Sequence, residues 1–455
     1  MSPTTIYTLT FNCARNPISL STLTTHLSNS LKASSPPDLI FLSLQEIAPV
    51  YASFIGNSFL TSYYTPLLSA VDAATQNAFS TTYESIAIRN VGMTAIMIFA
   101  RDPSRVNNVE TAGVGCGKME MGNKGAVGVR LSYRAEESME AEELTFVAAH
   151  LAASEGAVER RNEDWRNIVR RLMFTSSTTE LNSKSALAAS TRTSLVSSQD
   201  RDGDDDDNQP LIANESRSTP TAMYKESTHL FIAGDLNYRT APTAPTSSSP
   251  TTHFPSPTSE SSSPRHHLNY LSNDQLNRER KAGRTMHGLQ ELEIKFPPTY
   301  KYVHNHDGKA NNEDNENAEE EEDFTDFSKE TWDFAPHRWP SWCDRILYLP
   351  DSIVGDSYTA LPLMPTSDHR AVAATYTIPS TSSPSQTDAS TNSDIRLNPP
   401  FAIDPRWAQR RSFARKLEIV VGWCAYFTTS VEGAVYALAG ILGVVGLCVG
   451  VGAIF

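Results

Sequence analysis

The stretch Phe231 to Arg239, FIAGDLNYR, constrains the fold of this chain more than any other. An apolar run with the composition of a β-strand ends at a glycine, and polar residues then alternate with apolar ones. The alternation predicts that Asp235, Asn237 and Arg239 emerge together at the end of the strand, where groups that bind phosphate or activate water are often found. Taken alone, the stretch is equally consistent with a strand followed by a turn that an Asp side chain stabilises.

The same arrangement recurs along the chain. Apolar runs at 6–11, 39–44 and 144–149 predict strands that end beside polar residues, and runs at 345–349 and 371–377 predict strands that begin beside them. The polar residues at these strand ends are Asn12, Glu46, His150, Asp344, Asp368 and His369. Helical spacing at 20–31, 155–174 and 274–292 alternates with the strands, which indicates an α/β protein.

Low-complexity segments divide the 455 residues. Tracts rich in Ser, Thr, Pro or acidic residues at about 175–227, 241–264 and 305–328 have the composition of disordered inserts. We therefore expect one catalytic domain over residues 1–378, a linker over 379–405, and a C-terminal region over 406–455.

The net charge of −14 is concentrated in two short runs. Residues 200–207 carry six Asp against one Arg, and residues 313–326 carry nine acidic and no basic residues, so these runs account for the whole −14. The remainder is near neutral and shows no long basic stripe, which argues against a nucleic-acid partner but allows a local basic pocket. The five cysteines are scattered without metal-ligand spacing, which favours a reducing compartment, and no signal peptide is evident.

The C-terminus has the composition of a membrane anchor. Residues 433–455 contain no charged residue and are long enough to span a bilayer, whereas 419–431 is shorter. A basic cluster precedes them, formed by Arg406, Arg410, Arg411, Arg415 and Lys416. We expect a transmembrane helix with the catalytic region in the cytosol, and which membrane it enters stays open. The alternative is a buried core helix.

The polar residues at the strand ends form a chemically coherent set. Carboxylate and amide oxygens suit a hard divalent cation, and two histidines with an Asp suit proton transfer and the orientation of water. No Ser or Cys with an adjacent base stands out as a nucleophile. Direct attack of water on a phosphate, assisted by a divalent cation, is the chemistry that these residues favour.

Eight short motifs resemble the inositol polyphosphate 5-phosphatase family, within the DNase I-like endonuclease/exonuclease/phosphatase superfamily. They occur in family order between Ile6 and Thr377: TFN, SLQE, GNKGAV, HLAA, GDLNYR, PTYKY, PSWCDRIL and SDHR. With its C-terminal hydrophobic anchor the chain is most similar to fungal-type members. The resemblance implies a four-layer α/β sandwich, in which two packed mixed β-sheets are flanked by helices.

The resemblance also implies roles for the residues in these motifs. Glu46 and Asn12 are expected to hold Mg²⁺, and Asp235 to orient and help deprotonate the attacking water. Asn237 and His150 are expected to donate hydrogen bonds to the phosphoryl group. His369 is expected to contact the scissile phosphate, with Asp344 orienting its ring, and Asp368 is expected to support the metal site. Substrate contacts are expected from Tyr300, Lys301 and Arg345 to the 4-phosphate, from Lys124 near the 1-phosphate, and from Arg239.

The function expected on this basis is removal of the 5-phosphate from a membrane phosphoinositide, with phosphatidylinositol 4,5-bisphosphate as the expected substrate. Two alternatives stay open. One is a phosphodiesterase of the same superfamily that acts on nucleic acid or sphingolipid, and the other is a non-catalytic tether that binds phosphoinositides at the membrane. The sequence leaves the oligomeric state open.

Overall fold

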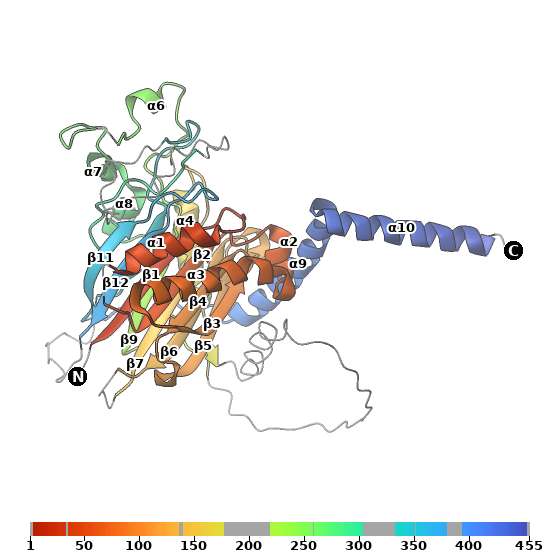
Figure 1. Ribbon diagram of the computed structural model, residues 1–455, viewed down its shortest axis with the longest axis horizontal. Helices are drawn as coiled ribbons and strands as arrows, with labels where there is room; N and C mark the ends of the chain where they lie inside the picture. The colour runs from red at the N-terminus through yellow and green to blue at the C-terminus, as the bar shows by residue number, and fades with distance from the viewer. Residues whose placement is uncertain are drawn as a thin grey trace.

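Two six-stranded β-sheets packed face to face form the centre of the protein in the computed structural model (Figure 1). The structure describes residues 3–32, 35–135, 140–176, 219–257, 259–303, 333–350, 352–379 and 394–452, with side chains up to residue 442. The first sheet has the order β11-β12-β1-β2-β4-β3 and the second β10-β9-β7-β6-β5-β8. β1 and β2 are parallel, as are β7 and β9, and the other pairs are antiparallel, so both sheets are mixed.

The bounds of β1, β2, β7, β9, β10 and β12 agree closely with the apolar runs of the sequence. The strands of the first sheet are β1 (Thr4–Asn12), β2 (Leu39–Gln45), β3 (Glu84–Val91), β4 (Thr94–Ala100), β11 (Val354–Ala360) and β12 (Val372–Ile378). Those of the second are β5 (Val106–Gly115), β6 (Gly125–Tyr133), β7 (Glu142–His150), β8 (Thr175–Ser176), β9 (Thr228–Asp235) and β10 (Asp344–Tyr348).

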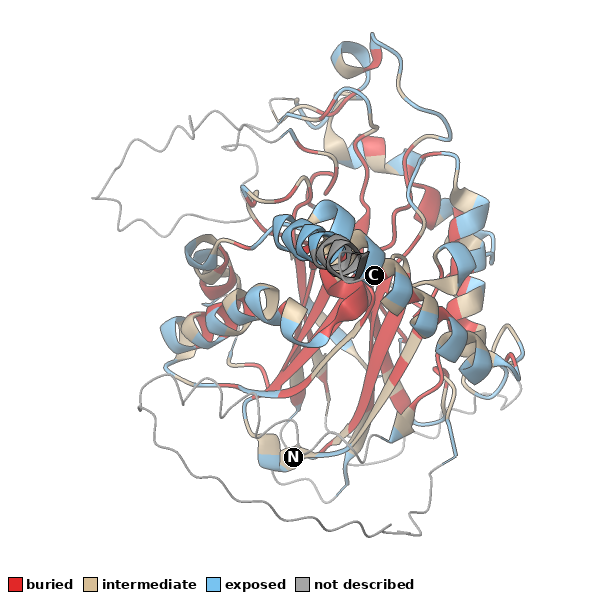
Figure 2. Cartoon of the chain, turned by 90° about the vertical axis from the view of Figure 1, so that its right-hand side faces the viewer, coloured by how far each residue is buried: buried red, intermediate tan, exposed pale blue. Residues whose placement is uncertain are grey.

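Helices cover the outer faces of the sheets, and the strands between them are buried (Figure 2). The α-helices are α1 (Leu20–Lys32), α2 (Val50–Ile55), α3 (Thr61–Phe79), α4 (Val158–Arg171), α6 (Ser249–Thr252), α7 (His267–Tyr270), α8 (Gln275–Lys281), α9 (Trp407–Thr429) and α10 (Val431–Gly452). Short 3₁₀ turns are η1 (Asn57–Leu60), η2 (Pro103–Arg105), η3 (Lys118–Glu120) and η5 (Leu271–Asn273). α1 and α3 pack on the first sheet, and α4 packs on the second. This arrangement confirms the predicted packing of two mixed sheets flanked by helices.

The space between the sheets is apolar at one end and polar at the other. Side chains alternate along a strand, so every second residue points between the sheets. On β7 the inward residues Leu144, Phe146 and Ala148 belong to the inter-sheet core, and His150 continues the same row. On β9 the inward residues Phe231 and Ala233 are followed by Asp235. His150 and Asp235 are therefore the last inward-facing residues of β7 and β9, and the earlier inward-facing residues of both strands form the core.

Aromatic rings fill the centre of this inter-sheet core. Phe146 stacks on Phe231 with ring centroids 5.6 Å apart, and it contacts Phe41 of the opposite sheet at 5.2 Å. Phe231 in turn contacts Tyr376, also of the opposite sheet, at 5.3 Å. These contacts join the two sheets below the polar end.

Three expectations from the sequence differ from the structure. The helix predicted over 274–292 ends at Lys281, because Gly283 and Gly288 adopt φ of +66° and +73°, which are left-handed conformations. The nineteen-residue helix α3 was not predicted. Part of the segment 241–264, expected as a disordered insert, is described with Phe254 packed on Trp339 at 5.5 Å between ring centroids. The other two inserts fall largely in 177–218 and 304–332, outside the described residues.

The C-terminal region differs from the predicted linker and anchor. Residues 394–404 contact the domain, for example through an ion pair of 3.0 Å from Arg171 Nε to Asp404 Oδ2, and α9 packs against α2. The predicted short apolar segment 419–431 lies mostly within α9. Among the described residues, no helix combines the length and apolar character needed to cross a membrane, so the membrane anchor predicted over 433–455 is not supported.

Removing the ring at the centre of the aromatic contacts should destabilise the whole domain. We expect Phe146→Ala to lower the free energy of unfolding by about 3–5 kcal/mol, because a buried ring is replaced by a cavity. Chemical denaturation followed by tryptophan fluorescence measures the change. Leu20→Ala, at a position that is 45% exposed, is the matched control and should change it by less than about 0.5 kcal/mol. Equal effects of the two substitutions would show that this core is not the one that stabilises the fold.

Candidate active site

Strand direction brings the polar residues of both sheets to one edge. The parallel strands β1 and β2, and likewise β7 and β9, end there, and the antiparallel β6, β10 and β12 begin there. His150 is therefore opposite Gly125 and Asp235, and Asp235 is also opposite Asp344. The two sheets meet where Asn12 Nδ2 donates to Asp235 Oδ2 over 2.9 Å.

A cavity of about 360 Å³ opens at this edge. It is lined by Asn12, Ala14, Arg15, Asn16, Glu46, Lys124, Ala153, Asp235, Asn237, Arg239, Tyr300, Lys301, Asp368 and His369. The lining combines carboxylates with lysine, arginine and histidine side chains, which is the composition of a site for an anionic ligand.

Asp235 lies at the centre of the cavity lining and is almost fully buried. Its Oδ1 accepts from the backbone N–H of Asn237 over 3.0 Å, and its Oδ2 lies 3.3 Å from His150 Nε2. Burial raises the pKa of Asp235, but the hydrogen bond from His150 and the charges of His369 and Lys124 outweigh it, so the pKa lies below its ordinary value. The carboxylate therefore stays ionised and can accept hydrogen bonds from a ligand or a water molecule.

His150 and Lys124 contact each other beside Asp235, through His150 Nε2 and Lys124 Nζ. Burial lowers the pKa of His150, and Lys124 lowers it further, so its imidazole is neutral near pH 7. Burial also lowers the pKa of Lys124, while Asp235 and Glu46 act in the opposite direction. Lys124 Nζ lies 3.9 Å from Glu46 Oε1.

Asn237 and Arg239 are held together just beyond β9. Asn237 adopts a left-handed φ of 58°, and its Nδ2 donates to the backbone oxygen of Leu151 over 3.1 Å. Arg239 Nε donates to the Asn237 backbone oxygen over 3.1 Å, and its guanidinium lies 4.2 Å from the centre of the Tyr300 ring. Arg239 Nη1 is buried and has no hydrogen-bond partner among the described residues. A buried guanidinium nitrogen without a partner indicates a place for an anionic oxygen.

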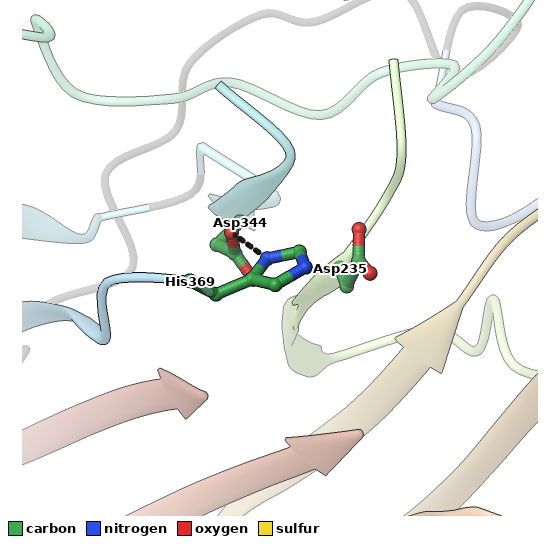
Figure 3. A group of neighbouring side chains, drawn as sticks. All are labelled: Asp235, Asp344 and His369. Atoms are coloured by element: carbon green, nitrogen blue, oxygen red, sulfur yellow. Dashed lines mark hydrogen bonds and ion pairs between the residues drawn. The ribbon is translucent and has the colours of Figure 1, made fainter. Parts of the chain in front are cut away.

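Asp344, the first residue of β10, forms a buried pair with His369, which lies shortly before β12 (Figure 3). His369 Nδ1 lies 2.8 Å from Asp344 Oδ2, which also accepts from Thr299 Oγ1 over 2.7 Å. Burial lowers the pKa of His369, but Asp344, followed by Asp235 and Asp368, raises it to about 9. The imidazole is therefore protonated near pH 7, with its second nitrogen on the side of Asp235 (Figure 3). Burial raises the pKa of Asp344 to about 6, and the opposing effect of His369 is smaller.

Lys301 and Asp368 form an ion pair in the cavity lining, through Lys301 Nζ and Asp368 Oδ2. Their side chains are 26% and 16% exposed, so both are accessible from the cavity. Burial raises the pKa of Asp368, but His369 and Lys301 outweigh it, and the pKa is lowered. Tyr300 lies between this pair and Arg239, with its ring 4.6 Å from that of His369.

Glu46 is held in a conformation that few residues adopt. Its φ of 46° is left-handed, as are those of Ala14 and Arg15 in the neighbouring loop after β1. Such conformations cost about 1–3 kcal/mol each and cluster at functional sites. Glu46 Oε2 lies 3.0 Å from Arg15 Nε, and Asn12 Oδ1 accepts from the Ala14 backbone N–H over 3.0 Å.

Two groups of residues could hold a metal ion. Glu46 and Asn12 line the cavity with oxygen ligands, which suit Mg²⁺ or Ca²⁺. The other group is Asp235, Asp344 and His369, whose ligand atoms all lie within 4.8 Å of one another. We favour the first group, because in the second His369 Nδ1 and Asp344 Oδ2 already bind each other.

The structure brings most of the predicted site residues to one place. Ten line the cavity: Asn12, Glu46, Lys124, Asp235, Asn237, Arg239, Tyr300, Lys301, Asp368 and His369. His150 and Asp344 lie directly behind the lining, in contact with Asp235 and His369 respectively.

Arg345 is the exception. It is fully buried and lies outside the cavity lining, with Nε 2.6 Å from Glu291 Oε1 and Nη1 3.1 Å from Asp274 Oδ1. Because its charge is already paired inside the protein, this position does not fit the predicted contact with a substrate phosphate.

Two polar residues of the cavity lining were not predicted from the sequence. Arg15 and Asn16 line it from the loop after β1, and Asn16 Nδ2 donates to the Thr366 backbone oxygen over 2.7 Å. Their position three and four residues after Asn12 was the available signal, since loops at this edge of the sheet face the cavity.

Comparison with known proteins agrees with this architecture. The family described as "Endonuclease/Exonuclease/phosphatase family 2" matches residues 9–375, which contain all the predicted site residues.

Curated relatives match over part of their length. The type II inositol polyphosphate 5-phosphatase 15 of Arabidopsis thaliana is 32% identical over 244 residues, covering 53% of this chain and 18% of that protein. The polyphosphatidylinositol phosphatase INP53 of Saccharomyces cerevisiae is 26% identical over 350 residues, covering 75% of this chain and 24% of that protein. The chain therefore spans at most about a quarter of the length of these relatives.

A solved structure shares the fold. The inositol polyphosphate 5-phosphatase domain of SPsynaptojanin, solved with inositol (1,4)-bisphosphate and a calcium ion, superposes with a TM-score of 0.54 at 23% identity. The superposition covers 83% of this chain and 84% of that one.

The raised pKa of His369 predicts how stability depends on pH. The folded protein holds this proton up to about pH 9, whereas the ordinary pKa of a histidine is 6.5. The protonated His369 therefore stabilises the folded state fully below about pH 6.5, and this stabilisation is lost as the pH rises through 9. We expect the melting temperature of the wild type to fall more steeply between pH 7 and 10 than that of His369→Asn, measured by differential scanning fluorimetry. The variant His253→Asn removes an exposed histidine and should retain the wild-type slope. Parallel profiles for wild type and His369→Asn would contradict the assignment.

Proposed function

Because the chain belongs to the endonuclease/exonuclease/phosphatase family, we propose that it is a phosphatase that removes the 5-phosphate of phosphoinositides. The relatives are curated as inositol polyphosphate or phosphoinositide phosphatases, which supports this class of substrate. Phosphatidylinositol 4,5-bisphosphate is the substrate we propose first, because it carries a 4-phosphate, the group that we propose Lys301 to contact.

One observation carries the proposal: cationic and acidic groups suited to hydrolysis line the same cavity. Arg239 and Lys124 offer donors to phosphate oxygens, and protonated His369 offers a third. Asp235 lies among them as an ionised carboxylate. A phosphate group and a water molecule can therefore be held side by side without a protein nucleophile.

In this mechanism Asp235 orients the attacking water by accepting its hydrogen bond. Asp344 fixes the ring of His369, so that Nδ1 is engaged and Nε2 is available for an oxygen of the scissile phosphate. As negative charge develops on that phosphate, the donors from His369, Arg239 and Asn237 stabilise it, because they are already in position and lie in a largely buried site.

Glu46 and Asn12 are the residues we propose to hold a divalent cation, Mg²⁺ in the cell. Their oxygen atoms line the cavity beside Asp235, and the left-handed conformation of Glu46 indicates that its direction is functionally constrained. A bound Mg²⁺ supplies Lewis-acid stabilisation of charge on the scissile phosphate.

Substrate recognition is proposed for the cations on the cavity lining. Lys301, carried by the PTYKY motif, is accessible and lies next to Tyr300 and Asp368, where a neighbouring 4-phosphate could replace the carboxylate as its partner. Lys124, from the GNKG turn, is proposed to contact the phosphate that joins the inositol ring to the lipid. Arg239 is proposed to bind the scissile phosphate through its free Nη1.

A substrate panel tests the proposal most directly. The full-length protein should release inorganic phosphate, measured with malachite green, from 5-phosphorylated phosphoinositides in the presence of Mg²⁺ and should stop releasing it when EDTA is added. Asp235→Asn should lower kcat by about 10²–10⁴, while Asp72→Asn, at an exposed position, should not. No release from any 5-phosphorylated substrate would refute the proposal, and cleavage of nucleic acid or sphingomyelin instead would identify a phosphodiesterase.

Lys301 should distinguish substrates that carry a 4-phosphate. We expect Lys301→Met to lower kcat/KM about tenfold for phosphatidylinositol 4,5-bisphosphate, since a charge-assisted hydrogen bond is lost, and much less for phosphatidylinositol 3,5-bisphosphate. Initial rates on both lipids, presented in the same micelles, give the comparison. Lys295→Met removes a lysine that is 73% exposed and should alter neither rate. An equal loss on both lipids would remove the assignment of Lys301 to the 4-phosphate.

A further inference from the structure

The helix α9 lies beyond residue 375, where the match to the family ends, yet it contacts the active-site side of the domain. It packs on α2, with Gly422 against Phe54 and Ile55, and it approaches the loop of residues 116–124 between β5 and β6. We call this segment the Lys124 loop, because Lys124 at its end lines the cavity.

Glu418 makes the central contact between α9 and the Lys124 loop. It is fully buried, and its Oε1 accepts from the backbone N–H of Gly122 over 2.9 Å. Its charge is balanced by Arg411, with Nη1 2.6 Å from Oε1, and by Arg415, with Nη1 3.3 Å from Oε2. A buried carboxylate with two arginines and one backbone N–H has a defined geometry, since each partner fixes its direction.

Gly122 is held from its other side as well. Its backbone oxygen accepts from the Met93 N–H over 2.9 Å, and a Cβ at Gly122 would lie 2.7 Å from the backbone nitrogen of Gly92. The loop therefore lies directly on the turn between β3 and β4, with Glu418 closing the remaining side. The position of Gly122 is fixed by groups from two separate parts of the chain, the turn between β3 and β4 and the helix α9.

A second contact holds the same loop two residues earlier. Glu120 Oε1 lies 2.6 Å from Arg410 Nη1 of α9 and 2.9 Å from Arg171 Nη1 of α4. Both arginines also contact Asp404, just before α9, at 3.0 Å. The start of α9 and the Lys124 loop thus share one network of charges.

We propose that α9 is part of the catalytic apparatus, with Glu418 as the residue that positions the Lys124 loop. Gly122 is separated from Lys124 by one residue, and the Lys124 backbone oxygen accepts from the Cys116 N–H over 2.7 Å, which closes the loop. A displacement of Gly122 is therefore transmitted to Lys124, whose Nζ contacts His150 and lies 3.9 Å from Glu46. This inference rests on the proposed function, in which Lys124 binds substrate.

Two substitutions separate the reach of Glu418 from its charge. Glu418→Asp keeps the charge for the arginines but is too short to accept from Gly122, whereas Glu418→Gln keeps an oxygen in reach and loses the charge. If positioning matters, Glu418→Asp should lower kcat/KM about tenfold, mainly through KM, and Glu418→Gln should lower it much less, although it lowers the melting temperature. Gln409→Ala, at an exposed position of α9, is the control and should behave as the wild type.

The experiment measures phosphate release from phosphatidylinositol 4,5-bisphosphate in micelles, together with hydrogen exchange of the amides at 116–124, on variants of the whole 455-residue chain. In a Lys124→Ala background, Glu418→Asp should add less than about a twofold further loss, because the two residues act through one contact. The exchange of the loop amides should be faster in Glu418→Asp than in the wild type.

Several outcomes would overturn the proposal. The first is a Glu418→Asp variant with wild-type kcat/KM and wild-type exchange of the loop amides. The second is a double variant in which the losses of the two single variants multiply. The third is a larger loss of kcat/KM in Glu418→Gln than in Glu418→Asp. If the wild type itself releases no phosphate from any substrate, the proposed function fails, and the exchange of the loop in Glu418→Asp alone decides whether α9 positions it.

Discussion

The hydrogen bond from Asn12 to Asp235 joins the two sheets at the point on which the rest of the site depends. Asn12 ends β1 and Asp235 ends β9, so this contact links the two rows of inward residues at their polar ends. Below it, Phe41, Phe146 and Phe231 fill the space between the sheets. The aromatic core thus sets how closely the sheets approach each other, and the same spacing applies at the polar ends of these strands.

Burial makes the charges in this cavity dependent on one another. Asp235 remains ionised although it is buried, because His150, His369 and Lys124 offset the cost of removing it from water. His369 in turn keeps its proton because Asp344 lies 2.8 Å away. Removing either member of such a pair leaves a buried charge without a partner, which is usually more costly than the net contribution of the pair itself. The site is therefore a set of mutually dependent charges.

Much of the fold and the site could be predicted because their signals are local. Each strand is a short apolar run with a polar residue at its end, and the ordered motifs place these ends in one family architecture. The role of α9 could not be predicted in this way. Glu418 is one acidic residue in a helix whose first half carries arginines and whose second half is mostly apolar, and only the tertiary structure pairs it with Gly122, 296 positions away. Residues 419–431 suggested an apolar segment, but part of that apolar surface packs on α2 through Gly422.

The placement of Arg345 follows from a rule that the sequence already contained. Asp344 and Arg345 are neighbours on β10, and neighbours on a strand point to opposite faces of the sheet. Asp344 shares its face with Ile346, which belongs to the inter-sheet core, so its carboxylate reaches His369. Arg345 shares the other face with Leu347, which packs in the core beneath α4, and it meets Asp274 and Glu291 there. A motif places both residues in one segment, but the alternation of the strand allows only one of them to face the site.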